Sequence, residues 1–331
     1  MGRLVCVTFQ SIQIMKGIFL YYLLPICCLI WLARCGQPQA KDQQAITTDT
    51  SQTIGRDTLL GTDSVNKANE QEKPVPSKDC LPLAQMQTLI IAGHAVDIAI
   101  PKDSSLVKAN LLILQGWSFP KDDWCKKSSL CKKALAQGYR LIMPEMGKST
   151  YSSRLYPQTL AQWRKYPTLK WVTDSLIPHL QKKYCVMTAE QANFVVGLST
   201  GARGAGLVVM NRPTLFKAAA ALSGDFDQRK IPYDKIMTGF YGSIYQFPKR
   251  WAGEDNMIVN IQQFSTPFYL GHGKLDRVCP PAQTLQFYQA LKKHHPKLKV
   301  TLSMPAWAAH NYKYWDYEVD RFLKFFREIS Q

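Results

Sequence analysis

The sequence contains no spacing of cysteines and histidines that is typical of a metal site. None of its nine cysteines forms a C-x-x-C pair, and its six histidines do not cluster with them. Zinc-finger, RNP and helix-turn-helix signatures are also missing, which argues against nucleic acid as a partner. We therefore expect a protein that works without a metal ion, an organic cofactor or nucleic acid.

Acidic residues are scarce. The chain has 24 Asp and Glu residues against 41 Lys and Arg residues, a formal net charge of +17. Residues 80–331 carry 33 of the basic and 17 of the acidic residues, so nearly all of the excess lies in this part of the chain. Such a surface attracts anionic lipid, polysaccharide or acidic substrates in a salt-dependent way. The alternative is a generally basic exported protein with no specific anionic partner.

Long hydrophobic runs are rare, and the main one lies near the N-terminus. Residues 18–32 are apolar but interrupted by Pro25, so the run is too short and too broken to predict a membrane-spanning helix. Lys16 directly precedes it, which gives the charged n-region and apolar h-region of a signal peptide. Residues 1–35 are therefore predicted to be an export segment, and Met15 is an alternative start of translation.

The end of this segment, Leu32-Ala33-Arg34-Cys35, resembles a bacterial lipobox, in which the cysteine is lipidated and becomes the mature N-terminus. Arg34 departs from the pattern, which has a small residue before the cysteine. The resemblance implies a lipid on Cys35 that holds the protein to a membrane of the bacterial cell envelope. Ordinary secretion and an uncleaved signal anchor remain alternatives, and all three export the rest of the chain.

Residues 36–79 are rich in Gln, Thr, Asp and Ser and are predicted to be a disordered polar tether. Five cysteines follow it: Cys80, Cys125, Cys131, Cys185 and Cys279. In an oxidising compartment we expect disulfides among them, with one thiol left over. Cys125 and Cys131 are close enough in sequence to close a small ring, worth roughly 2 kcal/mol on the chain-entropy estimate.

Residues 80–331 are predicted to be a single α/β domain. Two short strands about Gly93 come first, and from Asn110 onwards strand and helix patterns alternate. Strands are expected at 110–114, 139–144, 193–198, 216–222, 267–271 and 298–303, and helices at 129–137, 173–184, 200–211, 281–293 and 317–329. This alternation predicts a mostly parallel sheet with helices on both faces.

Residues 226–264 break the alternation with turns and aromatic side chains. An insertion between two sheet strands lies above the carboxyl ends of the strands, where open α/β sheets bind ligands. We therefore predict a short cap over a pocket. Ordinary aromatic packing is the alternative.

The motif that carries the functional prediction is Gly197-Leu198-Ser199-Thr200-Gly201. An apolar run precedes it and a segment rich in small residues follows, which predicts a buried strand that turns sharply into a helix. Ser199 would then stand at a helix N-terminus, where the dipole and the free N–H groups favour developing negative charge. We predict that Ser199 is a nucleophile, the alternative being a glycine-rich turn.

A serine nucleophile needs a base, and the base needs an orienting acid. His310 follows the last predicted strand, on a loop before the terminal helix, and is the best candidate for the base. Asp276 lies just past the preceding strand and is the best candidate for the acid. His272 and Asp225 are the respective alternatives.

The order Ser199, Asp276, His310 along an alternating chain resembles the α/β-hydrolase superfamily over about residues 88–329. The resemblance implies a Ser-His-Asp triad in a fold of this class. Gln115-Gly116-Trp117 is similar to the His-Gly-x segment of that superfamily, with Gln115 in place of the usual His.

The same resemblance implies an oxyanion hole made by the backbone N–H groups of Trp117 and Thr200. Residues 213–224 look like the putative-esterase branch that includes esterase D and feruloyl esterases. Thr200 and Arg203 depart from that branch, which tends to have smaller residues there.

The sequence therefore predicts an exported serine hydrolase that cleaves carboxylic esters through an acyl-enzyme. The expected substrate is a small-molecule or polysaccharide-linked ester. A peptidase or an acyltransferase on the same fold is the first alternative. A catalytically silent lipoprotein that binds an envelope polymer is the second.

Overall fold

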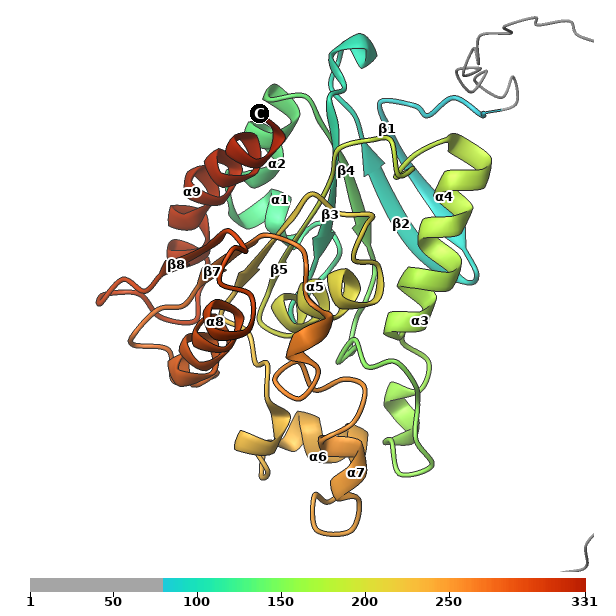
Figure 1. Ribbon diagram of the computed structural model, residues 1–331. Helices are drawn as coiled ribbons and strands as arrows, with labels where there is room; N and C mark the ends of the chain where they lie inside the picture. Colours follow the sequence, from blue (N-terminus) through green and yellow to red (C-terminus); the bar gives the residue numbers. More distant parts are fainter. Residues whose placement is uncertain (1–79) are drawn as a thin grey trace, which may run out of the picture. The chain divides into compact units, whose positions relative to one another are not determined.

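The computed structural model describes residues 80–331. Within this range eight strands form one sheet in the order β1-β2-β4-β3-β5-β6-β7-β8 (Figure 1). The strands are β1 (Met86–Ile91), β2 (His94–Ala99), β3 (Ala109–Leu114), β4 (Tyr139–Pro144), β5 (Asn193–Leu198), β6 (Ala218–Leu222), β7 (Phe268–Gly271) and β8 (Val300–Ser303). From β4 to β8 every neighbouring pair is parallel. The antiparallel hairpin β1-β2 extends the sheet at the β4 edge.

Helices cover both faces of this sheet (Figure 1). One face carries α1 (Asp123–Lys127), α2 (Leu130–Ala136) and α9 (Tyr312–Ser330), and the other carries α3 (Leu169–Trp171), α4 (Ile177–Tyr184), α5 (Thr200–Asn211) and α8 (Pro281–His294). Because side chains of a strand alternate between faces, Leu112 and Leu114 enter one core while Leu111 and Ile113 enter the other. The predicted mostly parallel sheet with helices on both faces is confirmed.

Several helices differ from their predicted bounds or were not predicted. The terminal helix begins at Tyr312 rather than at 317, because the Asn311 side chain caps it by accepting from the Tyr314 N–H. The helix predicted at 173–184 starts with a π-helical turn, Val172–Leu176, before α4. The short α1 was not predicted, since five residues are too few to show a helical period.

The segment between β6 and β7 contains two short helices, α6 (Lys235–Tyr241) and α7 (Pro248–Trp251). They lie together at one end of the domain (Figure 1). Their apolar side chains form a small separate core, which also includes Trp163 from the segment before α3. The aromatic residues that broke the sequence pattern thus pack mainly among themselves beyond the sheet.

Two disulfides join four of the five cysteines in the described range, Cys80 to Cys185 and Cys125 to Cys131. The ring predicted between Cys125 and Cys131 is confirmed, and Cys279 is the remaining thiol among residues 80–331. No helix in the described part of the chain is long and apolar enough to cross a membrane. The predicted export segment, Cys35 and the tether lie outside the described residues.

Candidate active site

Ser199 occupies a strained turn between β5 and α5. Its backbone has φ 55° and ψ −124°, a conformation that residues with a side chain rarely adopt. The turn is so tight that a Cβ on Gly197 would overlap the backbone of Gly201. A Cβ on Gly201 would in turn overlap the carbonyl groups of Leu114 and Gln115. The glycines are therefore required by the close approach of three backbone segments, and Ser199 is partly exposed at the helix N-terminus.

The parallel strands bring all the predicted site residues to one edge of the sheet. The loop of Trp117 follows β3, Ser199 follows β5, Asp276 follows β7 and His310 follows β8. Carboxyl ends of parallel strands lie at the same edge, which is where open α/β sheets bind their ligands. Residues far apart in sequence thus meet there.

The predicted acid and base are hydrogen-bonded to each other. His310 Nδ1 lies 2.7 Å from Asp276 Oδ2, so Nδ1–H donates to the carboxylate. The loops that carry them are tied together, since the Leu275 N–H donates to the Ala308 carbonyl at 2.9 Å. A Cβ on Gly273 would overlap that same carbonyl, which explains why a glycine occupies this position in the loop that carries Asp276.

Asp276 is held in its ionised form. Burial would raise its pKa, but hydrogen bonds from His272 and His310 and from the Cys279 N–H outweigh burial and hold the pKa well below the ordinary value. Its other oxygen, Oδ1, accepts from the Val278 and Cys279 N–H groups, both at 2.9 Å. A carboxylate fixed in this way orients an imidazole and stabilises it when protonated.

His272, the alternative base, is a buried neighbour of the same carboxylate. Its Nε2 lies 3.2 Å from Asp276 Oδ2 and 3.0 Å from the Cys279 carbonyl, so this nitrogen carries the proton. Nδ1 then accepts from the Thr284 hydroxyl at 2.7 Å. With both nitrogens engaged inside the fold, His272 supports Asp276, a role that the sequence did not indicate.

The remaining predictions concern the hydrogen bond between Ser199 and His310 and the oxyanion hole. Within residues 80–331, no hydrogen bond joins the Ser199 hydroxyl to His310. The backbone N–H groups of Trp117 and Thr200 donate to no other group of the described chain, so both are available to an incoming ligand. In unliganded sites such catalytic contacts are commonly long. The triad and the oxyanion hole therefore stay predictions.

Comparison with known proteins decides the family. Residues 136–331, more than half of the chain, match the prolyl oligopeptidase family. The chain belongs to the prolyl oligopeptidase family. No curated protein matches the sequence significantly.

Solved structures resemble this family member in fold. FphF, a fluorophosphonate-binding serine hydrolase of Staphylococcus aureus, is 18% identical with a TM-score of 0.57, and the match covers 73% of this chain and 96% of that one. The S-formylglutathione hydrolase of Agrobacterium tumefaciens is 15% identical with a TM-score of 0.59, covering 73% and 94%. A putative dipeptidyl aminopeptidase IV of Bacteroides ovatus is 16% identical with a TM-score of 0.53, covering 74% of this chain but 36% of that one. The domain has the α/β-hydrolase fold, and the protein is a hydrolase of the serine esterase or peptidase type.

In this family member Asp225, the alternative acid, forms an ion pair with Arg203. Its Oδ2 accepts from the guanidinium of Arg203 at 3.0 Å, and Arg203 is completely buried. Arg203 also donates to the Tyr241 hydroxyl and to the Asp255 carbonyl, both at 2.9 Å. Burial raises the pKa of Asp225 although Arg203 opposes this. The residue that departs from the esterase pattern therefore links helix α5 to the segment after β6.

Trp315 in α9 is a site residue that the sequence did not indicate. Its indole N–H donates to the Ser223 hydroxyl at 3.1 Å. The indole ring meets the His310 imidazole edge-on, with ring centroids 5.1 Å apart. It thus limits the positions that the imidazole of this family member can take. The two residues are only five apart in sequence, but the contact spans the junction between the loop that carries His310 and α9, where no regular repeat fixes which side chains face each other.

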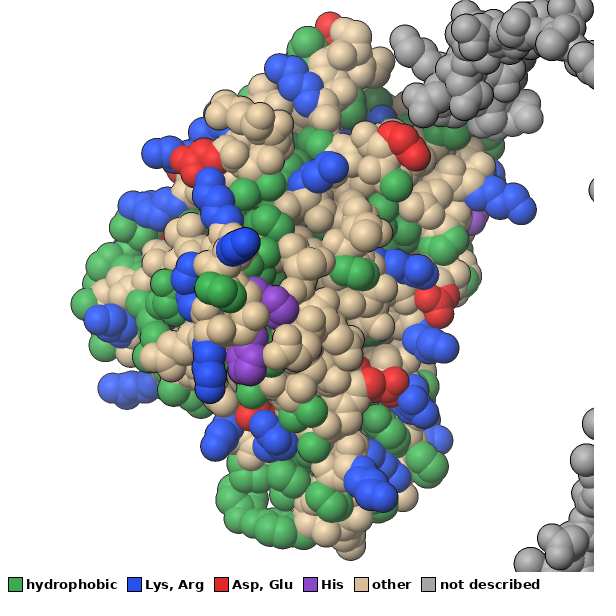
Figure 2. Space-filling view, in the orientation of Figure 1, with side chains coloured by type: hydrophobic (Ala, Val, Ile, Leu, Met, Phe, Trp, Pro, Cys, Tyr) green, Lys and Arg blue, Asp and Glu red, His purple; other side chains and the backbone are tan. Residues whose placement is uncertain are grey.

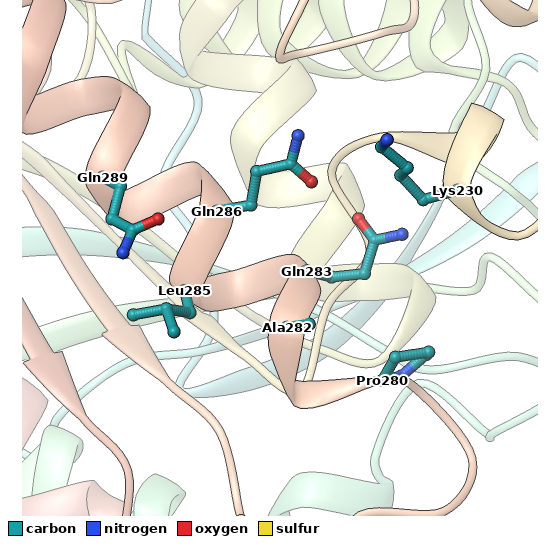
Figure 3. A pocket seen from close by; sticks show the side chains of 7 residues that line it. All are labelled: Lys230, Pro280, Ala282, Gln283, Leu285, Gln286 and Gln289. Carbon is teal, nitrogen blue, oxygen red and sulfur yellow. The ribbon is translucent and has the colours of Figure 1, made fainter.

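Two hollows adjoin at Pro280. A small cavity of about 70 Å³ lies beside Ser199. Its walls are formed by the segment after β6, by helix α6 and by the loop that carries Asp276. A larger groove of about 480 Å³ runs along the first turns of α8 (Figure 3). Gln283, Gln286 and Lys230 contribute polar side chains to it, and Pro280 lines both hollows. The family member therefore has a small hollow at the predicted nucleophile and a larger one next to it.

Proposed function

We propose that the protein hydrolyses carboxylic esters through an acyl-enzyme on Ser199. The observation that carries the proposal is the buried, ionised Asp276 bound to His310 at the edge of the sheet where Ser199 occupies its strained turn. Serine, imidazole and carboxylate in this order are the groups that activate a hydroxyl for acyl transfer.

The reaction follows from the roles of these groups. The Ser199 oxygen forms a bond to the ester carbonyl carbon while His310 accepts the hydroxyl proton, and the N–H groups of Trp117 and Thr200 stabilise the oxyanion. The carbon–oxygen bond to the alcohol then breaks, and His310 gives its proton to the departing alkoxide. Water, deprotonated by His310, attacks the acyl-enzyme and releases the acid, which regenerates Ser199.

Ester rather than peptide chemistry is favoured by the neighbours of similar size. The S-formylglutathione hydrolase and a ferulic acid esterase are matched over 94% and 97% of their chains. The dipeptidyl aminopeptidase is matched over only 36% of its chain. Peptide hydrolysis is the second candidate, because the family match is to the prolyl oligopeptidases.

A fluorophosphonate probe and a short-chain aryl ester test the proposal together. We expect covalent labelling of Ser199, and loss of labelling and a fall in kcat on the order of 10⁴ or more in Ser199→Ala and His310→Ala. Ser265→Ala is the matched control, because Ser265 is an exposed serine outside the proposed machinery. Wild-type turnover by Ser199→Ala would contradict the proposal. Absence of both labelling and turnover in the wild type would favour a silent binding protein.

We also propose that the protein is exported and anchored through a lipid on Cys35. Two disulfides in the described domain support an oxidising compartment. Lys and Arg side chains are spread over the face in Figure 2, with few Asp and Glu among them, as suits an anionic envelope surface or a polysaccharide-linked ester. Mass spectrometry of the mature N-terminus should find diacylated or triacylated Cys35, and Cys35→Ser should lack it. An unmodified mature peptide that starts after Cys35 would contradict the anchor.

A further inference from the structure

The cavity beside Ser199 is the smaller of the two hollows that share Pro280. Its volume of about 70 Å³ is much smaller than the 480 Å³ of the groove along α8, so it suits a short acyl group better than a long chain. Ile231, Ile236 and Met237 form its apolar wall. A group bound covalently to Ser199 and turned into this space would be the acyl part of a substrate.

Two carboxylates face this cavity. Asp225 is 5% exposed, and its Oδ2 is paired with Arg203 while Oδ1 makes no hydrogen bond to another residue in the range 80–331. Asp234 lies at the start of α6, where its Oδ1 accepts from the N–H groups of Ile236 and Met237 at 2.9 Å. Its Oδ2 has no hydrogen-bond partner among the described residues. Each carboxylate therefore keeps one oxygen for a ligand.

A third polar group in the cavity wall lacks a partner. The Thr200 hydroxyl is buried and makes no hydrogen bond within the described chain, although Thr200 directly follows the predicted nucleophile. A buried hydroxyl without a partner is unfavourable, so a ligand that reaches it is favoured. The residue is 5% exposed, which sets it apart from ordinary surface threonines.

The charge of this cavity is opposite to that of the protein. The chain carries a net charge of +17, yet no Lys or Arg lines the cavity. Arg203 pairs with Asp225, and no Lys or Arg among the described residues pairs with Asp234. A ligand group that is small, hydrogen-bond donating and positively charged complements these walls.

We propose that this cavity binds a short acyl group that carries a protonated amine, as in an α-aminoacyl ester. The inference rests on the proposed esterase function and names its substrate class. The ammonium group would donate to Asp234 Oδ2 and Asp225 Oδ1 while Ser199 attacks the adjacent carbonyl carbon. The acyl transfer steps are those given above, with the free amino acid as the product.

Two esters that differ only in charge test the proposal. Alanyl and isobutyryl esters of the same phenol have the same shape, but the first bears an ammonium group where the second has a methyl group. Each kcat/KM is measured at a pH at which the α-amine is protonated. It is divided by the rate constant of uncatalysed hydrolysis of the same ester, because the ammonium group also activates the carbonyl carbon inductively. We expect the wild type to prefer the alanyl ester by about tenfold or more in kcat/KM, as charge-assisted hydrogen bonds provide.

The Asp234→Asn variant tests the negative charge of Asp234 separately from its role as a helix cap. Asn caps a helix as well as Asp does, so the start of α6 should be preserved while the carboxylate is removed. We expect the alanyl-to-isobutyryl ratio of kcat/KM to fall about tenfold. Asp234→Ser, which also caps, is the second variant in case the first does not fold. Asp320→Asn, an exposed aspartate on α9, is the control and should leave the ratio unchanged.

Failure of this inference and failure of the proposed function would give different results. Isobutyryl turnover without preference for the alanyl ester, or a ratio that neither Asp234 variant alters, overturns the assignment of the cavity and leaves the esterase function standing. Failure to turn over either ester, together with failure of the fluorophosphonate probe to label Ser199, overturns the proposed function and this inference with it.

Discussion

Asp276 is the residue on which most of the site's interactions converge. It accepts hydrogen bonds from two imidazoles and two backbone N–H groups while its side chain is fully buried. A buried carboxylate is costly unless it is paired in this way. The same contacts that prepare it to orient His310 therefore also stabilise the folded chain.

This predicts a pH-dependent loss of stability in Asp276→Asn. The pKa of Asp276 in the folded protein lies well below 3.8, so in acid the unfolded chain binds a proton before the folded chain does. Its stabilising contribution is complete above the unfolded pKa and disappears as the pH falls through the folded pKa. We expect the variant to have a lower Tm at pH 7, and the difference from wild type to narrow below about pH 4.

Calorimetry at several pH values measures this difference. Asp320→Asn is the control for the removal of a carboxylate, because Asp320 is exposed and its ion pair with Lys133 lies at the surface. A Tm difference for Asp276→Asn that stays constant from pH 7 to the acid limit would show that the carboxylate gains nothing from its partners.

Ser199, Asp276 and His310 could be predicted from the sequence, because each of them follows a predicted strand. It did not indicate His272 as a partner of Asp276, or Trp315 as a neighbour of His310. The partners are only four and five residues apart in sequence, but they lie in a loop or at a loop–helix junction, where no repeating pattern fixes which side chains face each other. Arg203 shows the same limit, because an arginine in a helix normally faces water and here it is completely buried.

Among the elements, the strand-turn-helix unit of β5 and α5 is the one that fixes the site. Gly201 contacts the end of β3 so closely that no side chain fits, whereas Gly93 in the β1-β2 turn has open space around it. Both positions look like turn glycines in the sequence. Their consequences should differ, because only Gly201 holds the nucleophile turn against the sheet.

We therefore predict that Gly201→Ala is the more damaging change. Its Cβ would displace the carbonyl groups of Leu114 and Gln115, which should cost about 2–3 kcal/mol and shift Ser199 from its position. Gly93→Ala should cost about 1–2 kcal/mol from its positive φ alone and keep full turnover. Urea unfolding and ester hydrolysis measure the two effects. Full turnover by Gly201→Ala, as is expected of Gly93→Ala, would show that the turn at Ser199 tolerates a side chain.

Element prediction succeeded where a strand is a continuous apolar run, because burial on both faces leaves a strong signal. The strand at 139–144 has the predicted bounds. It failed for α1, α6 and α7, each of which has seven residues or fewer. Such helices are held by caps and tertiary contacts, as Asp234 caps α6, and their sequences show no full period.

For the whole molecule, the two disulfides restrict very different lengths of chain. Cys80 and Cys185 are 105 residues apart and join the start of the described domain to the end of α4, whereas Cys125 and Cys131 are six apart within the α1-α2 region. A cross-link stabilises mainly by reducing the conformational freedom of the unfolded chain, and the gain grows with the length of the closed loop.

The last prediction is therefore a ranking of stabilities. The Cys80→Ser, Cys185→Ser double variant should lose about 4–5 kcal/mol of unfolding free energy, and the Cys125→Ser, Cys131→Ser double variant about 2 kcal/mol. Urea unfolding without reductant measures both, with the wild type in reductant as the reference for the loss of both bonds. A reversed order, or no difference between the two variants, would mean that native contacts rather than loop length set the contribution of each bond.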